Sequence, residues 1–254
     1  MKKSCPNKSF SILEGRKGIG GTWDLFKYPG VRSDSDMHTL GFRFKPWIHD
    51  KSIADGPSIM EYLHETVNEN RLNDNILLNH KVDSANWNSK KSQWELKINV
   101  NNDLKDMTCN FFFLCGGYYS YTKPHMPYFK NQENFKGQIV HPQFWDESLD
   151  YKNKKIAVIG SGATAITIVP AIAEQAEHVV MIQRSPTYVV SGPSEDVINK
   201  FLSRILPVRI TYFLIRWKNI LYQSFTFFMA RKYPERTKNK ICLLYTSPSP
   251  RDKS

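Results

Sequence analysis

The sequence predicts an α/β protein with parallel sheets, and three observations carry that prediction. An apolar strand at residues 156–159 runs into the glycine-rich turn 160–162, and an apolar helix follows. A second apolar strand follows this helix at residues 179–182. A separate apolar strand at residues 10–13 ends on Glu14. Strand, helix and strand at this spacing predict a parallel crossover, so we expect two dinucleotide-binding, Rossmann-like domains.

The N-terminal half is predicted to alternate loops with short elements. Residues 15–30 are rich in glycine and end in YPG, which indicates a loop. Apolar positions at helical spacing predict a helix over residues 57–67, with a proline in its first turn. A fully apolar run at residues 111–114, followed by two glycines, predicts a buried parallel strand. Short strands broken by polar turns are expected at residues 76–78, 82–87 and 94–100.

The C-terminal region combines aromatic and basic residues. Pro207 is expected to divide residues 198–231 into two helices. Aromatic side chains are so dense around Phe227 that we expect burial against another domain, and a helix lying on a membrane surface is the alternative. Residues 242–254 change composition abruptly, and their prolines and serines are expected to end the preceding helix. We interpret them as a non-native tail outside the fold.

Composition disfavours several classes of protein. The 254 residues carry a formal net charge of +11, but the basic residues are spread along the chain, so no nucleic-acid partner is expected. The four cysteines form no C-x-x-C pair, so we expect no metal site and reduced thiols in the cytoplasm. We expect no signal peptide and no membrane-spanning helix, although peripheral membrane contact stays open.

The turn after the strand at residues 156–159 fits a phosphate-binding loop. It reads G-x-G-x-x-A and opens a helix, which is the context that this motif requires. Glycines let the backbone approach a pyrophosphate, and a helix N-terminus offers free N–H donors and positive potential. A tight turn without a ligand is the alternative. The residues expected to contact the cofactor here are Gly160, Ser161, Gly162, Ala163 and Thr164.

A cation, Arg184, follows the second strand of this unit. An acid at this point would accept the ribose hydroxyls of NAD, whereas a cation matches the 2′-phosphate of NADP. Arg184 and Ser185 can both donate hydrogen bonds to that phosphate. The sequence therefore predicts NADPH rather than NADH as the cofactor, and an uninvolved surface arginine is the alternative.

Glu14 occupies the matching position for a different nucleotide. It ends a strand and precedes GIGGTW, where a ribose-binding acid is expected in a first dinucleotide fold. The glycine-rich turn of such a fold belongs about 20 residues upstream. No glycine precedes Glu14, so we expect the first domain to be incomplete at its N-terminus. On spacing alone, Glu14 is equally a solvated acid at a strand end.

The segment FKGQIVHPQFWD at residues 135–146 resembles the signature of the type I Baeyer–Villiger monooxygenases, F-x-G-x-x-x-H-x-x-x-W-[PD]. Further stretches resemble the same flavin-containing family, especially its ethionamide-activating group. They are GGTWDLFKYPGVRSDSDMHTLGFRFKPW, IADGPSIMEYL, FFFLCGGYY, VIGSGATAITIVPAIAE and QRSPTYVVS. The resemblance implies a partial FAD-binding domain over residues 1–150, linked through residues 135–146 to an incomplete NADP-binding domain with a helical extension over residues 151–241.

The resemblance also implies roles for residues on the flavin side. Glu14 would bind the ribose of FAD, and the backbone of Val82 would meet its adenine. Arg32, Ser33 and Asp34 would lie between the flavin and the nicotinamide. The other residues implied to contact FAD are Gly20, Gly21, Thr22, Trp23, Asp24, Leu25 and Gly117.

Two residues carry a possible catalytic role. The resemblance implies that Asp34 lies near the flavin and orients an arginine, for which this chain offers no matching residue; a carboxylate beside a cation reduces the cost of burying it. Asp36 nearby is interpreted as a loop or cap residue. His141 invites a general-base role, but the resemblance favours support of domain movement, with Phe135 and Trp145 as packing anchors.

The resemblance implies an FAD- and NADPH-dependent monooxygenase. It would insert one oxygen atom from O2 into a ketone, giving an ester or lactone, or would oxygenate a sulfur compound. An N- or S-oxygenating flavin-containing monooxygenase is the nearest alternative, and a disulfide reductase is disfavoured because C-x-x-C is absent. A third possibility is that the chain as given binds NADP(H) without turnover.

Overall fold

The computed structural model describes residues 1–184 and 194–246. The backbone divides into two compact units. The first unit comprises Met1–Tyr28 and Gly56–Leu149, and the second comprises Pro29–Asp55 and Asp150–Ser254. The structure therefore groups residues 29–55 with the second unit, whereas the sequence analysis kept them in the first domain. The assignment of one nucleotide to each predicted domain stays a prediction.

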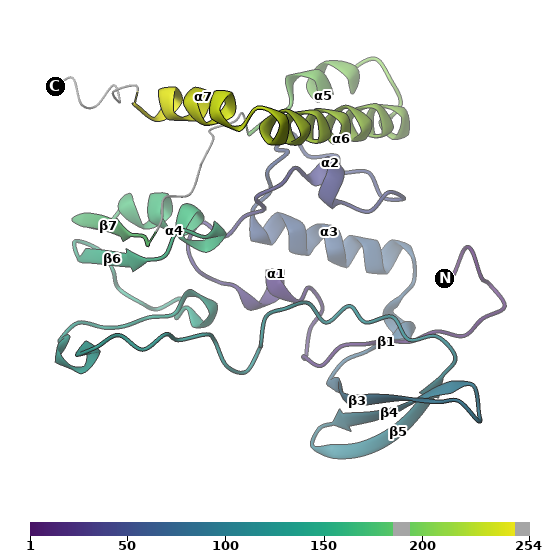
Figure 1. Cartoon of the computed structure of the whole chain (residues 1–254). Helices are drawn as coiled ribbons and strands as arrows, with labels where there is room; N and C mark the ends of the chain where they lie inside the picture. The colour runs from purple at the N-terminus through teal and green to yellow at the C-terminus, as the bar shows by residue number, and fades with distance from the viewer. Residues whose placement is uncertain (185–193, 247–254) are drawn as a thin grey trace. The chain divides into compact units, whose positions relative to one another are not determined.

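The first unit combines short helices with two small sheets, shown in purple to teal in Figure 1. Its elements in chain order are β1 (Ile12–Leu13), α1 (Thr22–Leu25), α3 (Gly56–Glu69), η1 (Asn73–Asn75), β2 (Ile76–Leu77), β3 (His80–Asn88), β4 (Gln93–Val100), β5 (Asp103–Cys109), η2 (Gln132–Asn134) and η3 (Pro142–Phe144).

The strand that ends on Glu14 forms a parallel pair. β1 pairs with β2, and the pairing continues through Glu14, whose N–H donates to the Leu77 carbonyl at 3.0 Å. α1 packs against α3, which buries Ile59 and Tyr62 and confirms the helix predicted over residues 57–67. The short strands predicted in this region are also confirmed. Glu14 thus stands at the carboxyl end of a parallel strand, as a nucleotide-binding fold requires.

The antiparallel sheet β3–β4–β5 contains one strand that the sequence analysis missed. β4 supplies the core residues Leu96, Ile98 and Val100. β5 is mostly polar and exposed, so it carries no alternating apolar pattern to predict it. It forms because Asn101 and Asn102 both have positive φ, 52° and 75°, which suits a two-residue hairpin turn.

The apolar run at residues 111–114 is not a buried strand, so that prediction was wrong. Phe111, Phe113 and Leu114 are each at least 75% exposed, and only Phe112 packs against the core of β4. A parallel strand needs neighbouring strands and helices on both faces. Among the described residues, β1 and β2 form a sheet of two strands, and this run pairs with neither of them.

The second unit contains a parallel strand pair and a group of helices (Figure 1). Its elements in chain order are α2 (Met37–Leu40), β6 (Lys155–Ile159), α4 (Ala163–Ala173), β7 (His178–Ile182), α5 (Val197–Leu202), α6 (Val208–Lys232) and α7 (Pro234–Thr246).

The predicted strand–helix–strand unit is confirmed. β6 and β7 are parallel, with Ile159 opposite Ile182, and α4 connects them. α4 buries Ala165, Ile168 and Ile172, which recur at helical spacing and give the helix one apolar face. This arrangement places the glycine turn between a strand end and a helix N-terminus.

The helical region also divides as predicted at Pro207, which occupies the N-cap position of α6. Proline has no N–H to donate and disfavours helical geometry in the residue before it, so α5 and α6 are separate. α7 runs to Thr246, into the predicted tail 242–254; residues 247–254 lie outside the described part of the chain.

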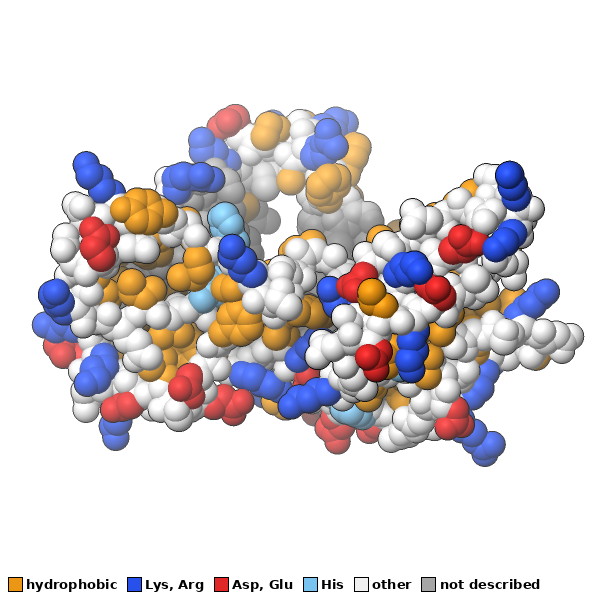
Figure 2. All heavy atoms as spheres, turned by 90° about the horizontal axis from the view of Figure 1, so that it is seen from below, with side chains coloured by type: hydrophobic (Ala, Val, Ile, Leu, Met, Phe, Trp, Pro, Cys, Tyr) orange, Lys and Arg blue, Asp and Glu red, His pale blue; other side chains and the backbone are white. Residues whose placement is uncertain are grey.

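Aromatic side chains near the end of α6 are exposed. Phe225, Phe227 and Phe228 are each more than half exposed, so the expected burial against another domain is not met among the described residues. Basic side chains on the face drawn in Figure 2 are spread among acidic and apolar ones. Within residues 1–184 and 194–246, no helix is both long and apolar enough to cross a bilayer.

Candidate functional site

The turn between β6 and α4 has an open glycine backbone. Gly160 has a φ of +133°, which favours glycine, and its N–H donates to the Ile182 carbonyl at 2.8 Å. Gly162 occupies the N-cap position of α4. A Cβ built on either glycine would meet no atom of the described residues within 4 Å. The turn therefore leaves space beside a helix N-terminus, whose first N–H groups lack intrahelical partners.

Arg184 belongs to the same edge of the β6–β7 sheet. Because Ile159 lies opposite Ile182, the residues that follow each strand emerge at the same edge. Arg184 follows two positions after Ile182 and its side chain is exposed. A cation at this position can meet a phosphate held beyond the neighbouring turn. The predicted contact Ser185 lies outside the described residues.

Gly30 anchors the segment 29–55 on α4. Gly30 has a φ of +80°, and a Cβ there would lie 2.5 Å from the Thr167 carbonyl oxygen and 2.8 Å from Ala171 Cβ. Glycine alone accepts both this backbone conformation and this close approach. The chain that leads to Asp34 is thereby held on the helix that begins at the open turn.

The turn before α1 is packed, in contrast to the turn before α4. Gly20 has a φ of +107°, and a Cβ there would lie 2.4 Å from Met60 Sδ. Gly21 occupies the N-cap position of α1 with a φ of +52°, and its added Cβ would lie 3.1 Å from the Tyr121 hydroxyl. The positive φ values favour glycine at both positions, and the space beside them is filled by side chains of the protein itself.

Arg16 links the residues of this packed turn, and the sequence analysis did not single it out. Its Nη2 lies 2.8 Å from Asp24 Oδ2, and its Nη1 donates to the Gly21 carbonyl at 2.8 Å. Its guanidinium also lies 5.3 Å from the centre of the Tyr121 ring. Asp24, predicted to contact FAD, thus has an internal partner that holds its carboxylate.

Three other predicted FAD contacts lie in the first unit. The Glu14 carboxylate is half-buried and accepts a hydrogen bond from the backbone N–H of Arg16 at 3.0 Å. The register of β3 against β4 shifts between Val82 and Ser84, so a bulge stands beside Val82. Gly117 has a φ of +70° and open space around it. Their contacts with a nucleotide stay predictions.

Arg32, Ser33 and Asp34 alternate between exposed and buried positions. Ser33 is buried: its N–H donates to the Ala54 carbonyl at 2.8 Å, and its Oγ accepts the Ala54 N–H at 3.1 Å. Arg32 forms an isolated bridge with Asp55 and is exposed. Asp34 is exposed, and among the described residues its carboxylate forms no hydrogen bond or ion pair. The Ser33 side chain therefore supports the fold, and the role expected of Asp34 stays a prediction.

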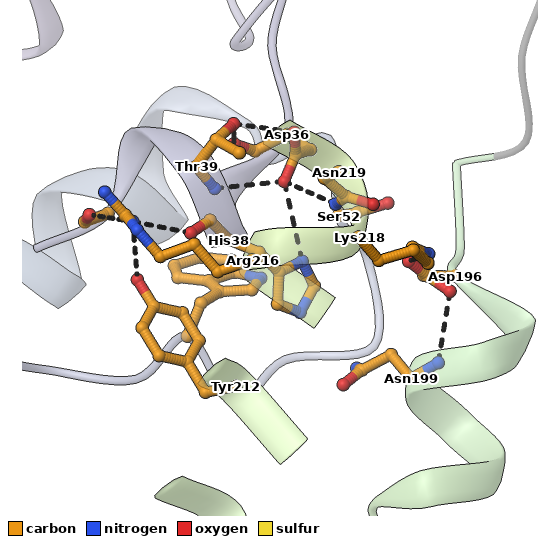
Figure 3. A network of polar contacts seen from close by, with 12 residues as sticks. Asp36, His38, Thr39, Ser52, Asp196, Asn199, Tyr212, Arg216, Lys218 and Asn219 are labelled. Carbon is orange, nitrogen blue, oxygen red and sulfur yellow. Dashed lines mark hydrogen bonds and ion pairs between the residues drawn. The ribbon is translucent and has the colours of Figure 1, made fainter. Parts of the chain in front are cut away.

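Asp36 connects the residues after Asp34 to α6, as Figure 3 shows. Its carboxylate accepts the Thr39 N–H at 3.0 Å and so caps α2, which confirms the expected cap role. Asn219 and Gln223 of α6 donate to the same carboxylate, at 2.8 and 2.9 Å. One acid therefore fixes both the start of α2 and its position against α6.

Arg216 of α6 fixes the other end of α2. Its Nη1 donates to the carbonyls of His38 and Gly41, at 2.7 and 2.9 Å. Carbonyls in the last turn of a helix lack intrahelical partners, so a guanidinium there satisfies them. Tyr212, one turn before Arg216, lies within 3.2 Å of it through its hydroxyl. Figure 3 shows these side chains around α2.

His38 is fully buried inside this network. Its Nδ1 lies 3.8 Å from Asp36 Oδ1, too far for a hydrogen bond, and neither ring nitrogen has a hydrogen-bond partner among the described residues. Burial lowers the pKa of His38, and the nearby carboxylates of Asp36 and Asp196 oppose that effect. The net direction is downward, which favours the neutral imidazole.

Asp196 and Lys218 form an ion pair beside His38. Asp196 also caps α5, because its Oδ1 accepts the N–H groups of Ile198 and Asn199. Burial alone would raise the pKa of Asp196, but the Lys218 ammonium and the Asn199 N–H outweigh it and lower the pKa. The carboxylate is thus held in its charged form.

The signature at residues 135–146 lies at the end of the first unit and serves as local structure. His141 Nδ1 accepts the Gln143 N–H at 3.2 Å, and burial lowers the pKa of His141, with His125 adding to the effect. Asp146 Oδ1 accepts the Ser148 hydroxyl and N–H, which lowers the pKa of Asp146. The arrangement shows turn-capping contacts for both residues, and a general-base role for His141 stays untested.

A family model described as flavin-binding monooxygenase-like matches residues 48–245. The chain belongs to that family. The matched range covers most of the second unit and the larger part of the first. The resemblance inferred from the signature and the flanking stretches is therefore confirmed.

Curated members of this family are similar to the chain over most of its length. It is 49% identical to the FAD-containing monooxygenase EthA of Mycobacterium tuberculosis over 245 residues, which cover 96% of this chain and 50% of that protein. It is 48% identical to the probable FAD-binding monooxygenase AlmA of an Acinetobacter species over 243 residues, covering 95% and 49%. The chain spans about half the length of these relatives.

Solved monooxygenase structures share the fold. An oxidized steroid monooxygenase bound to NADP matches with a TM-score of 0.63 and 28% identity, over 72% of this chain and 35% of that one. The cyclohexanone monooxygenase of Rhodococcus sp. Phi1 bound to NADP+ matches with a TM-score of 0.63 and 25% identity, over 76% and 36%. The predicted α/β fold class with parallel sheets is confirmed.

The structure brings some predicted site residues together, and it also shows contacts around them that the sequence did not predict. Gly160, Gly162 and Arg184 converge on one sheet edge, as predicted. Gly20 and Gly21 also form one turn, but Arg16 and Tyr121 support it, and no sequence spacing linked these two residues to the turn. The contacts of Asn219 and Arg216 with α2 were also missed, because they join residues far apart in the chain. Only Asp36, followed by Thr39 at cap spacing, gave a local signal.

Proposed function

We propose that the protein is a flavoprotein monooxygenase that uses NADPH and O2. The observation that carries the proposal is the open glycine turn at residues 160–162, with Arg184 at the same sheet edge. A pyrophosphate fits the space beside the two glycines, because no Cβ occupies it and the helix N-terminus is positive. The Arg184 guanidinium would pair with the 2′-phosphate of NADPH.

FAD would be held by the first unit. Two features support the fit: Glu14 ends a parallel strand with a half-buried carboxylate, and open space surrounds Gly117. Glu14 would accept ribose hydroxyls, and the turn before α1 would present its backbone to the flavin. When bound, FAD and NADPH together supply the reduction and activation of O2.

The chain's own residues would position and shield these groups. Asp34 has an exposed carboxylate without a partner among the described residues, so it can orient a cation near the flavin. α2 follows directly after it, and Asp36 and Arg216 fix α2 at both ends. The fixed helix limits the positions that Asp34 can take, which favours a defined geometry over a mobile loop.

The substrate class that we propose is a ketone or a sulfur compound. The signature ending in Trp145 and Asp146 supports ketone oxygenation to an ester or lactone. The names of the solved relatives, a steroid monooxygenase and a cyclohexanone monooxygenase, point the same way. A product panel of ketones, sulfides and amines tests it: esters or lactones, with or without S-oxides, support the proposal, whereas N-oxides without any ester or lactone favour the alternative flavin-containing monooxygenase.

NADPH binding tests the cofactor assignment directly. In titrations followed by tryptophan fluorescence, we expect Arg184→Gln to weaken NADPH binding about 10- to 50-fold and to leave NADH binding unchanged. Arg209→Gln, an exposed arginine of α6, is the matched control and should change neither affinity. Equal losses for NADPH and NADH would exclude a 2′-phosphate contact at Arg184.

A second candidate function is NADP(H) binding without turnover. The difference between the two turns favours it, because the turn before α4 is open while the glycines before α1 are occupied by protein contacts. Flavin absorbance separates the two candidates. Purified protein that is colourless but binds NADPH supports the binding function, and protein that retains FAD and consumes NADPH in air supports the monooxygenase. The cytoplasmic location expected from the cysteines stays a prediction.

A further inference from the structure

Helix α6 has an unusual composition for a surface helix. Between Val208 and Lys232 it contains no acidic residue, whereas its bases are Arg209, Arg216, Lys218, Arg231 and Lys232. It is also rich in aromatic residues. Surface helices of globular proteins normally carry charges of both signs on the side away from the core. The composition therefore indicates a partner that is apolar and anionic.

The inner face of α6 is occupied by the second unit. Thr211, Tyr212 and Ile215 are buried. Arg216 and Asn219 contact α2, as described above and as Figure 3 shows. This face therefore needs no further partner, and it fixes which side of the helix points outward.

The outer face carries a continuous apolar stripe. Its side chains are between 42% and 63% exposed and recur three or four positions apart, so they fall within about 80° around the helix axis, opposite the buried Tyr212. We call them the α6 stripe: Ile210, Leu214, Trp217, Leu221, Phe225 and Phe228. A row of exposed apolar side chains along about five turns of helix marks an interaction surface.

Cations accompany the aromatic end of the stripe. The Arg231 guanidinium lies 5.8 Å from the centre of the Phe227 ring, and the Lys232 ammonium lies 5.6 Å from that of Phe228. The same four side chains line a shallow hollow. Aromatic rings with long cationic side chains beside them are typical of helices that lie at a lipid–water boundary, where rings enter the acyl region and cations reach the headgroups.

We propose that the α6 stripe lies in the surface of an anionic lipid bilayer. The helix would lie in the interface rather than cross it, because it is not apolar enough to span. Arg216 and Lys218 have partners within the protein, so the cations that would meet lipid phosphates and carboxylates are Arg209, Arg231 and Lys232, each contributing attraction that salt screens. A second copy of the chain is a poorer occupant, because α6 carries no acid that could pair with these three cations on a facing α6.

Vesicle sedimentation tests the proposal with the full chain. We expect the protein to sediment with vesicles made of equal parts phosphatidylcholine and phosphatidylglycerol, and to stay in solution with phosphatidylcholine alone. Added salt should reduce the bound fraction. No sedimentation with the anionic vesicles, or equal sedimentation with both kinds, overturns the proposal.

A matched pair of variants shows whether the stripe itself is responsible. The double variant Leu221→Glu with Phe225→Glu should lower the bound fraction at least about tenfold, because it removes two apolar anchors and adds two negative charges. The control Leu104→Glu with Phe113→Glu changes equally exposed apolar residues of the first unit and should bind as the unchanged protein does. NADPH titration of all three proteins reports whether the second unit stays folded.

Light scattering without lipid separates the lipid surface from a second copy. We expect a monomer whose mass is the same for the unchanged protein and the stripe variant. A dimer that the stripe variant abolishes would place a second copy on α6 and overturn the lipid assignment. Equal loss of vesicle binding in the stripe variant and the control would also overturn it.

Discussion

Two glycine turns in this chain precede helices, yet their glycines serve opposite purposes. At the turn before α4, Cβ atoms on Gly160 and Gly162 would enter empty space. At the turn before α1, a Cβ on Gly20 would collide with Met60 of the neighbouring helix. Both turns read as glycine-rich in sequence. The comparison shows that two glycine-rich turns of similar sequence can differ in the space that the fold leaves beside them.

The arginines near the two turns differ in whether the protein itself already supplies their partners. Arg184, the cation near the open turn, is exposed, and its proposed partner is a phosphate of the cofactor. Arg16, the cation near the packed turn, already binds Asp24 and the Gly21 carbonyl. One arginine is thus available for recognition, while the other stabilises the fold. Substitutions at the two turns should separate binding from stability.

The largest expected effect is the loss of NADPH binding at the open turn. Gly162→Asp places a carboxylate where the pyrophosphate is proposed to lie, so we expect NADPH affinity to fall about 1,000-fold, or about 4 kcal/mol. The melting temperature should not change, because Gly162 has a φ of −78° and open space around it. Fluorescence titration and thermal unfolding measure the two quantities. Unchanged affinity would remove the pyrophosphate from this turn.

The packed turn should show the opposite result. Gly20→Ala forces a side chain onto a φ of +107° and displaces the flexible end of Met60, so we expect the unfolding free energy to fall by about 1–3 kcal/mol, mainly through backbone strain. NADPH affinity of the folded protein should stay the same. Urea unfolding followed by far-UV circular dichroism measures the loss.

A glycine of the same unit provides the control for Gly20. Gly116→Ala adds a Cβ with no atom within 4 Å and no positive φ, so we expect a change of less than about 0.5 kcal/mol. If Gly116→Ala and Gly20→Ala destabilise equally, the packing around Gly20 is not what requires a glycine there.

A smaller loss is expected when Arg16 is removed. Arg16→Met keeps much of the side-chain volume but breaks the ion pair with Asp24 and the hydrogen bond to Gly21. Both groups are only partly exposed, so we expect unfolding free energy to fall by about 1–2 kcal/mol. The same change at Arg209, an exposed residue of α6, should have little effect in the same urea titration. Equal losses would mean that the Arg16 contacts add nothing to stability.

The smallest effect concerns pH. Because burial lowers the pKa of His38, the unfolded chain binds this proton more readily than the folded chain. Titration of His38 therefore costs no stability above the ordinary histidine pKa of about 6.5. As pH falls below that value, the unfolding free energy declines by at most about 1.4 kcal/mol per pH unit. Urea unfolding at about pH 7.5 and at a mildly acidic pH, below the ordinary histidine pKa, measures how steeply the unfolding free energy depends on pH.

His38→Gln identifies the source of the pH dependence. The variant removes the titrating group, while Asp36, Asp196 and Lys218 around it are unchanged. We expect the unfolding free energy of the variant to depend less steeply on pH. Some dependence should remain, because burial also lowers the pKa of His141. A slope identical to that of the unchanged protein would show that His38 does not couple to unfolding.

The strand–helix–strand unit and the break at Pro207 could be predicted because each depends on neighbours in sequence. Apolar runs, a glycine turn and a proline act within a few residues, so their effect is visible in one dimension. The polar strand β5 could not be predicted in this way, since its pairing with β4 and not its own pattern makes it a strand. The prediction of a strand at residues 111–114 was wrong for the converse reason. The apolar pattern was clear, but among the described residues no strand pairs with this run.

Chain order and residue chemistry alone predicted the α/β class, a nucleotide turn at Gly160 and an NADP-type cation at Arg184, while the resemblance of residues 135–146 and the flanking stretches indicated the monooxygenase family. They did not distinguish the open turn from the packed one, and they did not reveal that α6 holds α2 through Arg216 and Asn219. These features depend on contacts between residues far apart in sequence, and on which side of a helix the core covers. Burial on one face of α6 is also what leaves the aromatic stripe exposed on the other.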